Sequence, residues 1–323
     1  MTTLPATMIP QLSAAQLHEL LPWESLAAAL AQAFRRPPVV PVRHTHALGD
    51  AEHLLMMPAW NAEVIGTKLV TVLPEAVRHG GRTVEATYLL LDRLTGAPRA
   101  VMDGEALTVR RTAATSALAA RLLARPDAHT LLMVGTGRLA PWMVRAHVAL
   151  LPAITRVLVW GRRPSAAVAM AAALRDEDIP AEPVGELADA IHSADVISCA
   201  TTSTEPIVRG AWLREGTHVD LVGAFTPAMR EVDDVAVMRA AVVVDDRAGA
   251  LAEAGDLLQP LAAGVIDRDH IRATLTDLLH GTSRVRTHAS DITLFKSVGH
   301  ALEDLAAATL ALSSLTTDPI GIA

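Results

Sequence analysis

The chain has 323 residues and a formal net charge of −7 at pH 7, and 51% of its residues are hydrophobic. This length is sufficient for two domains, and the acidic balance argues against a nucleic-acid partner, because such proteins carry clustered Lys and Arg. A single cysteine (Cys199), no apolar run long enough to span a bilayer and no secretory signal at the start predict a cytoplasmic protein with a small-molecule ligand, no disulfide and no membrane partner.

The first part of the chain predicts a mixture of helices and strands. Leucines at helical spacing indicate an amphipathic helix over 13–34. Short apolar segments, punctuated by Gly and Pro, then predict strands. They lie at 38–48, 52–60 and 64–74, and two more are joined at Thr95–Gly96 within 83–104. A long helix over 105–125 follows and ends before Pro126.

From residue 129 the pattern changes to alternating strands and helices. Apolar strands are predicted at 130–135, 156–161, 195–201, 218–224 and 241–246, with a short one near 181–184. Because these strands are mostly apolar and show no strict alternation, they suit a parallel sheet covered on both faces. The last stretch, 294–315, is predicted as a helix that returns to the first domain.

These elements predict an α/β fold with a discontinuous first domain. A Rossmann-type, doubly wound parallel-sheet domain (127–299) is inserted into an α+β substrate domain (1–126 plus 300–323).

The turn after the first strand of the inserted domain has the pattern G-x-G-x-x-A. Gly135 permits a tight turn, Gly137 lets the backbone approach a phosphate, and Ala140 lets the following helix pack closely. The helix N-terminus and Thr136 would add hydrogen-bond donors. The alternative is a plain turn, but its place at the start of a strand–helix series favours a dinucleotide site.

The end of the second strand indicates which dinucleotide would bind. An NAD site usually has an Asp or Glu there, which binds the ribose hydroxyls. This chain has Arg162, Arg163 and Ser165 instead. Two guanidinium groups and a hydroxyl suit a 2′-phosphate, so we predict NADPH as the preferred cofactor, with NADH possible. The alternative is that these are solvated loop charges.

Three cations of the first domain lie in apolar surroundings. Arg43 and Lys68 fall in predicted strands, and Arg111 lies near the start of an alanine-rich helix. Buried cations need a partner. We expect a substrate carboxylate to fill this role; the alternative is ion pairs with the chain's own Asp and Glu. Met56 could in addition touch a substrate ring.

Several segments together resemble the ornithine cyclodeaminase/mu-crystallin family along nearly the whole chain. They are "PVRHTH", "MMPAW", "GTKLV", "TGAPRAVMDGEALTVRRTAATSALAA", "VGTGRLA", "VGAFTPAMREVDD" and "FKSVGHALEDLAAA". The resemblance implies the discontinuous fold and a homodimer built through the first domain. It also implies one of several activities, which include ornithine cyclodeamination, alanine dehydrogenation and reduction of cyclic ketimines.

The resemblance also implies roles for individual residues. Arg43, Lys68 and Arg111 match positions that hold the substrate carboxylate; Lys68 is the catalytic candidate and Arg111 also reaches the cofactor. The cofactor positions implied are Thr83, Arg138, Leu139, Arg162, Thr201, Thr202, Val222, Gly223, Ala224 and Phe225, and Val298 would close the substrate pocket.

One departure from the family pattern bears on the reaction. The cyclodeaminases and alanine dehydrogenases of the family have a proton-transferring Asp where this chain has Phe225. Phenylalanine cannot carry a proton. We therefore expect an NAD(P)H-dependent oxidoreductase acting on the C=N bond of cyclic imines, making L-proline from Δ1-pyrroline-2-carboxylate or L-pipecolate from its six-membered homologue. The alternatives are an amino-acid deaminating enzyme and a non-catalytic binding protein like mu-crystallin.

Three histidines and two aspartates complete the candidates. His44, His46 and His53 match no zinc spacing, so no metal is expected. Asp245 and Asp246 end a predicted strand, where we expect them to be solvated.

Overall fold

The computed structural model describes residues 9–317, which fall into two compact units. The first contains the described residues up to Arg111 and those from Ala301 onward, and the second is Thr112–His300. The first unit therefore consists of two separate stretches of the chain. The boundary between its first stretch and the second unit lies inside a helix, whereas the sequence predicted it at 126/127. No helix of the described chain is long and apolar enough to cross a membrane.

The first unit is built on a six-stranded sheet with the order β1-β6-β5-β4-β3-β2. The pairs from β6 to β2 are antiparallel, and β1 joins β6 in parallel. Gly96 has the positive φ of 72° that the predicted turn requires. The strands are β1 (Gln11–Leu12), β2 (His44–Gly49), β3 (Glu52–Trp60), β4 (Val64–Val72), β5 (Val84–Asp92) and β6 (Pro98–Asp103).

Two predictions for this unit were partly wrong. The helix predicted over 13–34 is two helices, because Pro22 cannot donate the hydrogen bond that would continue the first one. The strand predicted over 38–48 begins only at His44, so Arg43 precedes it. The helical elements of the unit are α1 (Ala14–Leu20), α2 (Trp23–Arg35), η1 (Pro74–His79), the start of α3 (Gly104–Leu123) and α11 (Ala301–Thr317).

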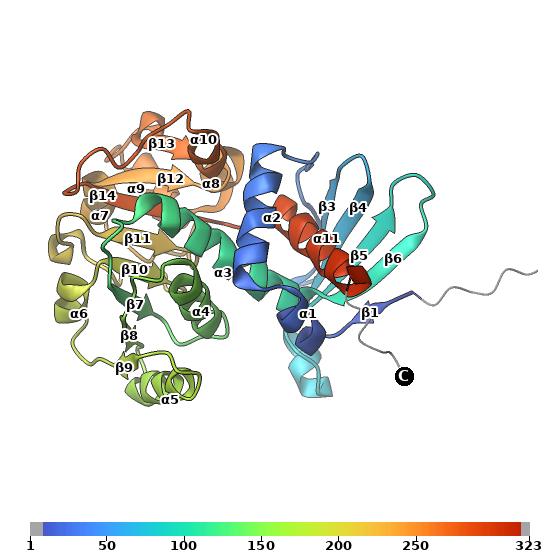
Figure 1. The fold of residues 1–323 in the computed structure, drawn as a ribbon, viewed down its shortest axis with the longest axis horizontal. Coiled ribbons are helices and arrows are strands. Elements are labelled where there is room, and N and C mark those ends of the chain that lie inside the picture. Colours follow the sequence, from blue (N-terminus) through green and yellow to red (C-terminus); the bar gives the residue numbers. More distant parts are fainter. Residues whose placement is uncertain (1–8, 318–323) are drawn as a thin grey trace, which may run out of the picture. The chain divides into compact units, whose positions relative to one another are not determined.

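Helix α11 brings the end of the described chain against its beginning. It packs against α2 and against β4 and β3 (Figure 1). Side chains alternate between the two faces of a strand, and the buried face of this sheet carries Met57, Val64, Lys68, Tyr88 and Leu90. Lys68 thus lies on the buried face of the sheet.

The second unit is built on an eight-stranded sheet with the order β13-β12-β14-β11-β10-β7-β8-β9, and every pair is parallel. Figure 1 shows this order from β9 at the bottom to β13 at the top. The predicted Rossmann-type doubly wound sheet is confirmed. Its strands are β7 (Thr130–Val134), β8 (Arg156–Trp160), β9 (Ala181–Pro183), β10 (Val196–Cys199), β11 (His218–Leu221), β12 (Ala240–Val244), β13 (Ile271–Thr274) and β14 (Ile292–Lys296).

The sequence did not predict β13 or β14. The helix predicted over 294–315 is wrong at its start, since residues 292–296 form a fully buried strand between β11 and β12. A segment of five residues has too little periodicity to separate strand from helix. The second unit's helical elements after α3 are α4 (Ala140–Leu150), α5 (Pro164–Arg175), α6 (Leu187–Ser193), η2 (Gly210–Trp212), α7 (Asp234–Arg239), α8 (Arg247–Glu253), α9 (Gly255–Ala262), η3 (Arg268–His270) and α10 (Leu275–His280).

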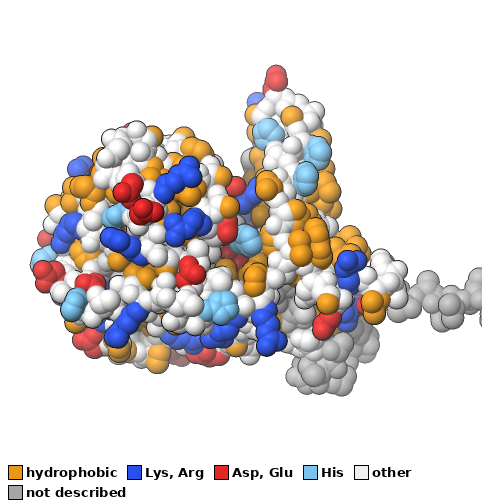
Figure 2. Space-filling model, turned by 90° about the horizontal axis from the view of Figure 1, so that it is seen from above, with side chains coloured by type: hydrophobic (Ala, Val, Ile, Leu, Met, Phe, Trp, Pro, Cys, Tyr) orange, Lys and Arg blue, Asp and Glu red, His pale blue; other side chains and the backbone are white. Residues whose placement is uncertain are grey.

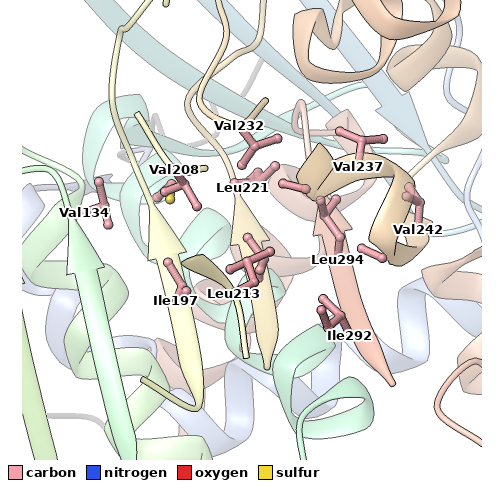
Figure 3. Packing of buried hydrophobic residues seen from close by; sticks show 14 of the residues in the cluster. Val134, Ile197, Val208, Leu213, Leu221, Val232, Val237, Val242, Ile292 and Leu294 are labelled. Atoms are coloured by element: carbon pink, nitrogen blue, oxygen red, sulfur yellow. The ribbon is translucent and has the colours of Figure 1, made fainter. Parts of the chain in front are cut away.

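The sheet reverses its strand order between β7 and β10. From β7 the chain adds β8 and β9 on one side, and from β10 it adds β11 on the other. Apolar side chains of these strands, such as Val134, Ile197 and Leu221, belong to one buried cluster, as Figure 3 shows. Ligands of open parallel sheets bind beyond the carboxyl ends of the strands at such a switch point.

Candidate functional site

A cavity of about 380 Å³ lies at this switch point, within the second unit. It is formed by the segments that follow β7, β8 and β10. Seven of the sixteen residues predicted to bind the cofactor line it, and they come from parts of the chain that are far apart in the sequence. The lining residues are Gly135, Thr136, Gly137, Trp160, Gly161, Arg162, Arg163, Ala200, Thr201, Thr202, Ser203 and Ile207.

The glycine turn is shaped by close backbone contacts. Gly135 has a φ of 119°, and a Cβ there would lie 2.6 Å from the carbonyl oxygen of Ala200. A Cβ on Gly137 would meet no atom within 4 Å, so the space beside its backbone is open. Helix α4 follows directly, and no side chain caps its N-terminus. Open space beside the backbone of this turn fits the pyrophosphate of a dinucleotide.

The cavity's charge is positive. Arg162 and Arg163 are exposed, and neither forms an ion pair within residues 9–317. The lining contains no Asp or Glu. Both guanidinium groups therefore remain available to an anion.

Other predicted cofactor residues lie outside that lining. Arg138 and Leu139 belong to the same glycine turn, and Ser165 is exposed in the first turn of α5. Thr83 belongs to the first unit, where it is exposed just before β5. Within the second unit, Arg138, Leu139 and Ser165 are not part of the cavity lining.

The segment after β11 adjoins the cavity through Gly223. A Cβ on Gly223 would collide with the carbonyl oxygen of Thr201, which lines the cavity. Val222 and Ala224 are buried, so they contribute backbone, whereas the Phe225 side chain is 46% exposed. The segment therefore lies beside the cavity, with Phe225 at its surface.

Asp245 was expected to be solvated, but in the structure it is buried. It is 2% exposed, and one carboxylate oxygen accepts hydrogen bonds from Ser297 Oγ (2.7 Å) and from the N–H groups of Val298 and Gly299 (both 2.9 Å). It thus holds the turn after β14 and is not solvated. Asp246 caps helix α8. Val298 packs on the apolar core of the second unit.

In the first unit, Lys68 and Arg111 form a buried cluster with two carboxylates of α11. Lys68 Nζ lies 2.8 Å from Asp304 Oδ2. Arg111 Nε lies 3.0 Å from Asp304 Oδ1, and its Nη1 lies 2.7 Å from Glu303 Oε2. Lys68 also donates to Thr108 Oγ1 at 3.3 Å. Two positive and two negative groups therefore neutralise one another inside the unit.

This cluster overturns one argument from the sequence. The cations were expected to need a substrate carboxylate, yet Glu303 and Asp304 already serve Lys68 and Arg111. Each cation nevertheless keeps a donor: an ammonium has three N–H groups, of which Lys68 uses two, and Arg111 Nη2 makes no hydrogen bond within the described chain. A ligand can therefore bind to cations that are already oriented.

The cluster shifts the pKa values of its members. Burial lowers the pKa of Lys68 below its usual value, although the negative charge of Asp304 opposes this. Burial would raise the pKa of Asp304, but Arg111 and Lys68 outweigh it and hold that pKa below its usual value. Burial, followed by the charge of Asp304, raises the pKa of Tyr88, which pairs with Lys68 across the strands. Asp304 is thus ionised, and Lys68 releases its proton more readily than a solvated lysine.

The remaining substrate candidates lie elsewhere in the first unit. Met56 is opposite Leu69, on the face of the sheet away from Lys68, and is 36% exposed. Within this unit, nothing therefore supports a single ligand that contacts both Met56 and Lys68. Arg43 is half-buried in the segment before β2.

Glu303, Asp304 and Glu231 were not assigned roles from the sequence. A signal existed for the first two, because adjacent acids in the otherwise apolar α11 require partners just as the buried cations do. Glu231 stands among other charged residues, so nothing marked it as buried. Within residues 9–317, no group of three or more His, Cys, Asp or Glu side chains is arranged to hold a metal ion.

Comparisons with known proteins agree with this architecture. A Δ1-pyrroline-2-carboxylate reductase of Paracoccus denitrificans is 42% identical over 240 residues, which are 74% of this chain and 76% of that protein. The solved Thermococcus litoralis Δ1-pyrroline-2-carboxylate reductase, in complex with NADH and L-proline, matches with a TM-score of 0.88 and 34% identity over 96% of this chain and 98% of its own.

An archaeal alanine dehydrogenase dimer with bound NAD also has a TM-score of 0.88, at 28% identity, over 97% of this chain and 98% of its own. The sequence profile of one family matches residues 8–317. The chain therefore belongs to the ornithine cyclodeaminase/mu-crystallin family.

Proposed function

We propose that this protein is an NAD(P)H-dependent reductase of cyclic imino acids, which converts Δ1-pyrroline-2-carboxylate to L-proline. The observation that carries the proposal is that the second unit holds a dinucleotide cradle and the first unit holds a buried lysine oriented by Asp304. The reductases from Paracoccus and Thermococcus, which resemble this chain over most of its length, support the same reaction. The six-membered imine, which would give L-pipecolate, is proposed as a second substrate.

The reaction adds a hydride to the ring carbon and a proton to the ring nitrogen, and breaks the C=N π bond. A bound nicotinamide supplies the hydride. We assign the proton to Lys68, whose free N–H can face the imine nitrogen and whose lowered pKa favours proton transfer. Asp304 stabilises the charged lysine until transfer and holds its direction.

The substrate carboxylate is assigned to the donors that the cluster leaves free. Arg111 Nη2 offers N–H groups, and Glu303 and Asp304 fix the plane of the guanidinium. Arg43 is proposed as a further cation for the same carboxylate. Rate enhancement then comes chiefly from positioning and from the exclusion of water.

NADPH is proposed as the preferred cofactor. The two unpaired arginines, Arg162 and Arg163, lie where an acid would bind the ribose of NAD. A 2′-phosphate can accept from both, whereas NADH leaves them to water. We also propose a homodimer, as in the archaeal alanine dehydrogenase, and a cytoplasmic location, which suits a single buried cysteine.

The test is an absorbance assay of NADPH oxidation with the five- and six-membered imines, run beside NADH. Stoichiometric formation of proline is the expected result. Ammonia release from ornithine with NAD⁺ would instead favour a cyclodeaminase, which is disfavoured because the exposed Phe225 carries no proton. Tight NADPH binding without turnover of either imine would favour a storage or signalling protein.

A further inference from the structure

A buried carboxylate connects two of the loops beside the dinucleotide cavity. Glu231 is 1% exposed, and its Oε1 accepts hydrogen bonds from the N–H (2.8 Å) and the hydroxyl (2.9 Å) of Thr201. Its Oε2 accepts from the N–H of Gly223 at 2.8 Å. Thr201 follows β10 and Gly223 follows β11, so a single side chain joins the ends of neighbouring strands.

The backbone of Glu231 is itself fixed. Its N–H donates to Asp256 Oδ1 at 2.7 Å, and its carbonyl accepts from the N–H groups of Ile207 and Val208, both at 2.9 Å. Asp256 in turn lies 3.2 Å from Lys296 Nζ. Val232, the next residue, packs near Val208 and Leu221 in Figure 3. Glu231 is thus anchored to the core and reaches out to the two loops.

The close fit of the second loop depends on this carboxylate. A Cβ on Gly223 would collide with Glu231 Oε1 as well as with the Thr201 carbonyl. The two loops therefore touch, and the two carboxyl oxygens of Glu231 accept from three donors that would otherwise lack a partner or require water. The direction of the Thr201 side of the cavity depends on that carboxyl group.

We propose that Glu231 is a positioning residue for the nicotinamide dinucleotide, acting through Thr201 and Gly223 without touching the ligand. This inference rests on the proposed function, in which the cavity that Thr201 lines and Gly223 adjoins is the cofactor site. The charged groups facing Glu231 are Asp256 and Lys296, which come from α9 and β14. They are buried, so they form part of the same fixed support.

The test compares Glu231→Gln with Glu182→Gln. Glutamine keeps the shape of Glu231, but its amide can accept at one end only, so either Thr201 or Gly223 loses its acceptor. Glu182 pairs with Arg156 on the surface of the same unit and serves as the matched control. NADH affinity, measured by fluorescence titration, should fall about tenfold or more in Glu231→Gln and stay unchanged in the control.

Amide hydrogen exchange supplies a readout that general destabilisation would not give. Glu231→Gln should speed exchange at Thr201 and Gly223 while the amides of β10 and β11 keep their protection. If Glu231→Gln does not fold, Thr201→Val should speed exchange at Gly223, because it removes the hydroxyl that donates to Glu231 and accepts from the Ser203 N–H. If both single variants fold, the double variant that combines Glu231→Gln with Thr201→Val should bind NADH no more weakly than Glu231→Gln alone.

Each outcome separates this inference from the proposed function. Wild type that binds neither NADH nor NADPH overturns the proposed function. If wild type binds the dinucleotide and Glu231→Gln has the same NADH affinity and the same amide exchange at Thr201 and Gly223, the positioning role is overturned and the proposed function stands. If Thr201→Val is the only foldable variant, unchanged exchange at Gly223 overturns the role as well.

Discussion

Asp304 places its two carboxylate oxygens on two different cations, Oδ2 at 2.8 Å from Lys68 Nζ and Oδ1 at 3.0 Å from Arg111 Nε. One residue of α11 therefore fixes both groups that are proposed to contact the substrate. Because the three side chains are almost fully buried, water can do little to replace a lost partner. The proton donor and the carboxylate-binding group thus depend on one acid.

Asp304→Asn should weaken both folding and catalysis. It leaves two buried cations with one carboxylate, Glu303, and loss of one member of such a network costs about 3–5 kcal/mol. We expect the free energy of unfolding in urea to fall by that order. The control is Glu75→Gln, which removes an exposed pair with Arg78 and should cost about 1 kcal/mol or less. Equal losses in the two variants would contradict the role given to Asp304.

Lys68→Ala should lower kcat for imine reduction by about 100-fold or more, the usual contribution of a positioned proton donor. Asp304 keeps Arg111 as a partner, so the fold should survive, which circular dichroism would check. NADPH affinity should change little, because Lys68 is proposed to contact the imine and not the dinucleotide. Activity equal to wild type would remove Lys68 from the mechanism.

Arg162→Ala should weaken the binding of NADPH and leave kcat for imine reduction nearly unchanged. The guanidinium is exposed and unpaired, so its loss should leave stability nearly unchanged. We expect KM for NADPH to rise about tenfold, the effect of one charge-assisted hydrogen bond to phosphate, and KM for NADH to stay within about twofold. Steady-state kinetics with both cofactors measure this, and a parallel rise in both KM values would argue against a 2′-phosphate contact.

The cofactor cradle could be predicted from the sequence because it depends on local features. Gly135 has a positive φ and a close backbone neighbour, and both demand glycine. The arginines after β8 stand at a fixed position in a regular strand–helix series. Such constraints act over a few residues, so a pattern in the chain records them.

The substrate cluster could be predicted only in part, because it depends on residues far apart in the chain. Lys68 and Arg111 could be recognised as cations in apolar segments, but their partners lie in α11, 193 residues beyond Arg111 in the case of Asp304. Misreading β14 as part of that helix also hid where α11 begins. Spatial pairing of charges, unlike a glycine turn, leaves no spacing signal.

The pH dependence of stability tests the buried state of Glu231. Burial, with Asp256 adding to it and Lys296 opposing it, raises the pKa of Glu231 to about 7 from an ordinary value of 4.5. A raised carboxyl pKa favours folding while the group is protonated, so this stabilisation is complete below about pH 4.5 and is lost as pH rises through about 7. The loss is on the order of 3 kcal/mol.

The measurement is the free energy of unfolding in urea at pH 5 and pH 8 for wild type and Glu231→Gln. Burial holds the pKa of His218 well below its usual value, which gives an opposite slope, but both proteins share it. The stability of wild type relative to the variant should therefore fall between the two pH values. If the difference in the free energy of unfolding between the two proteins is the same at both pH values, Glu231 has the same charge in the folded and unfolded chains across this range. In that case burial does not shift the pKa of the carboxyl group that holds the loops after β10 and β11.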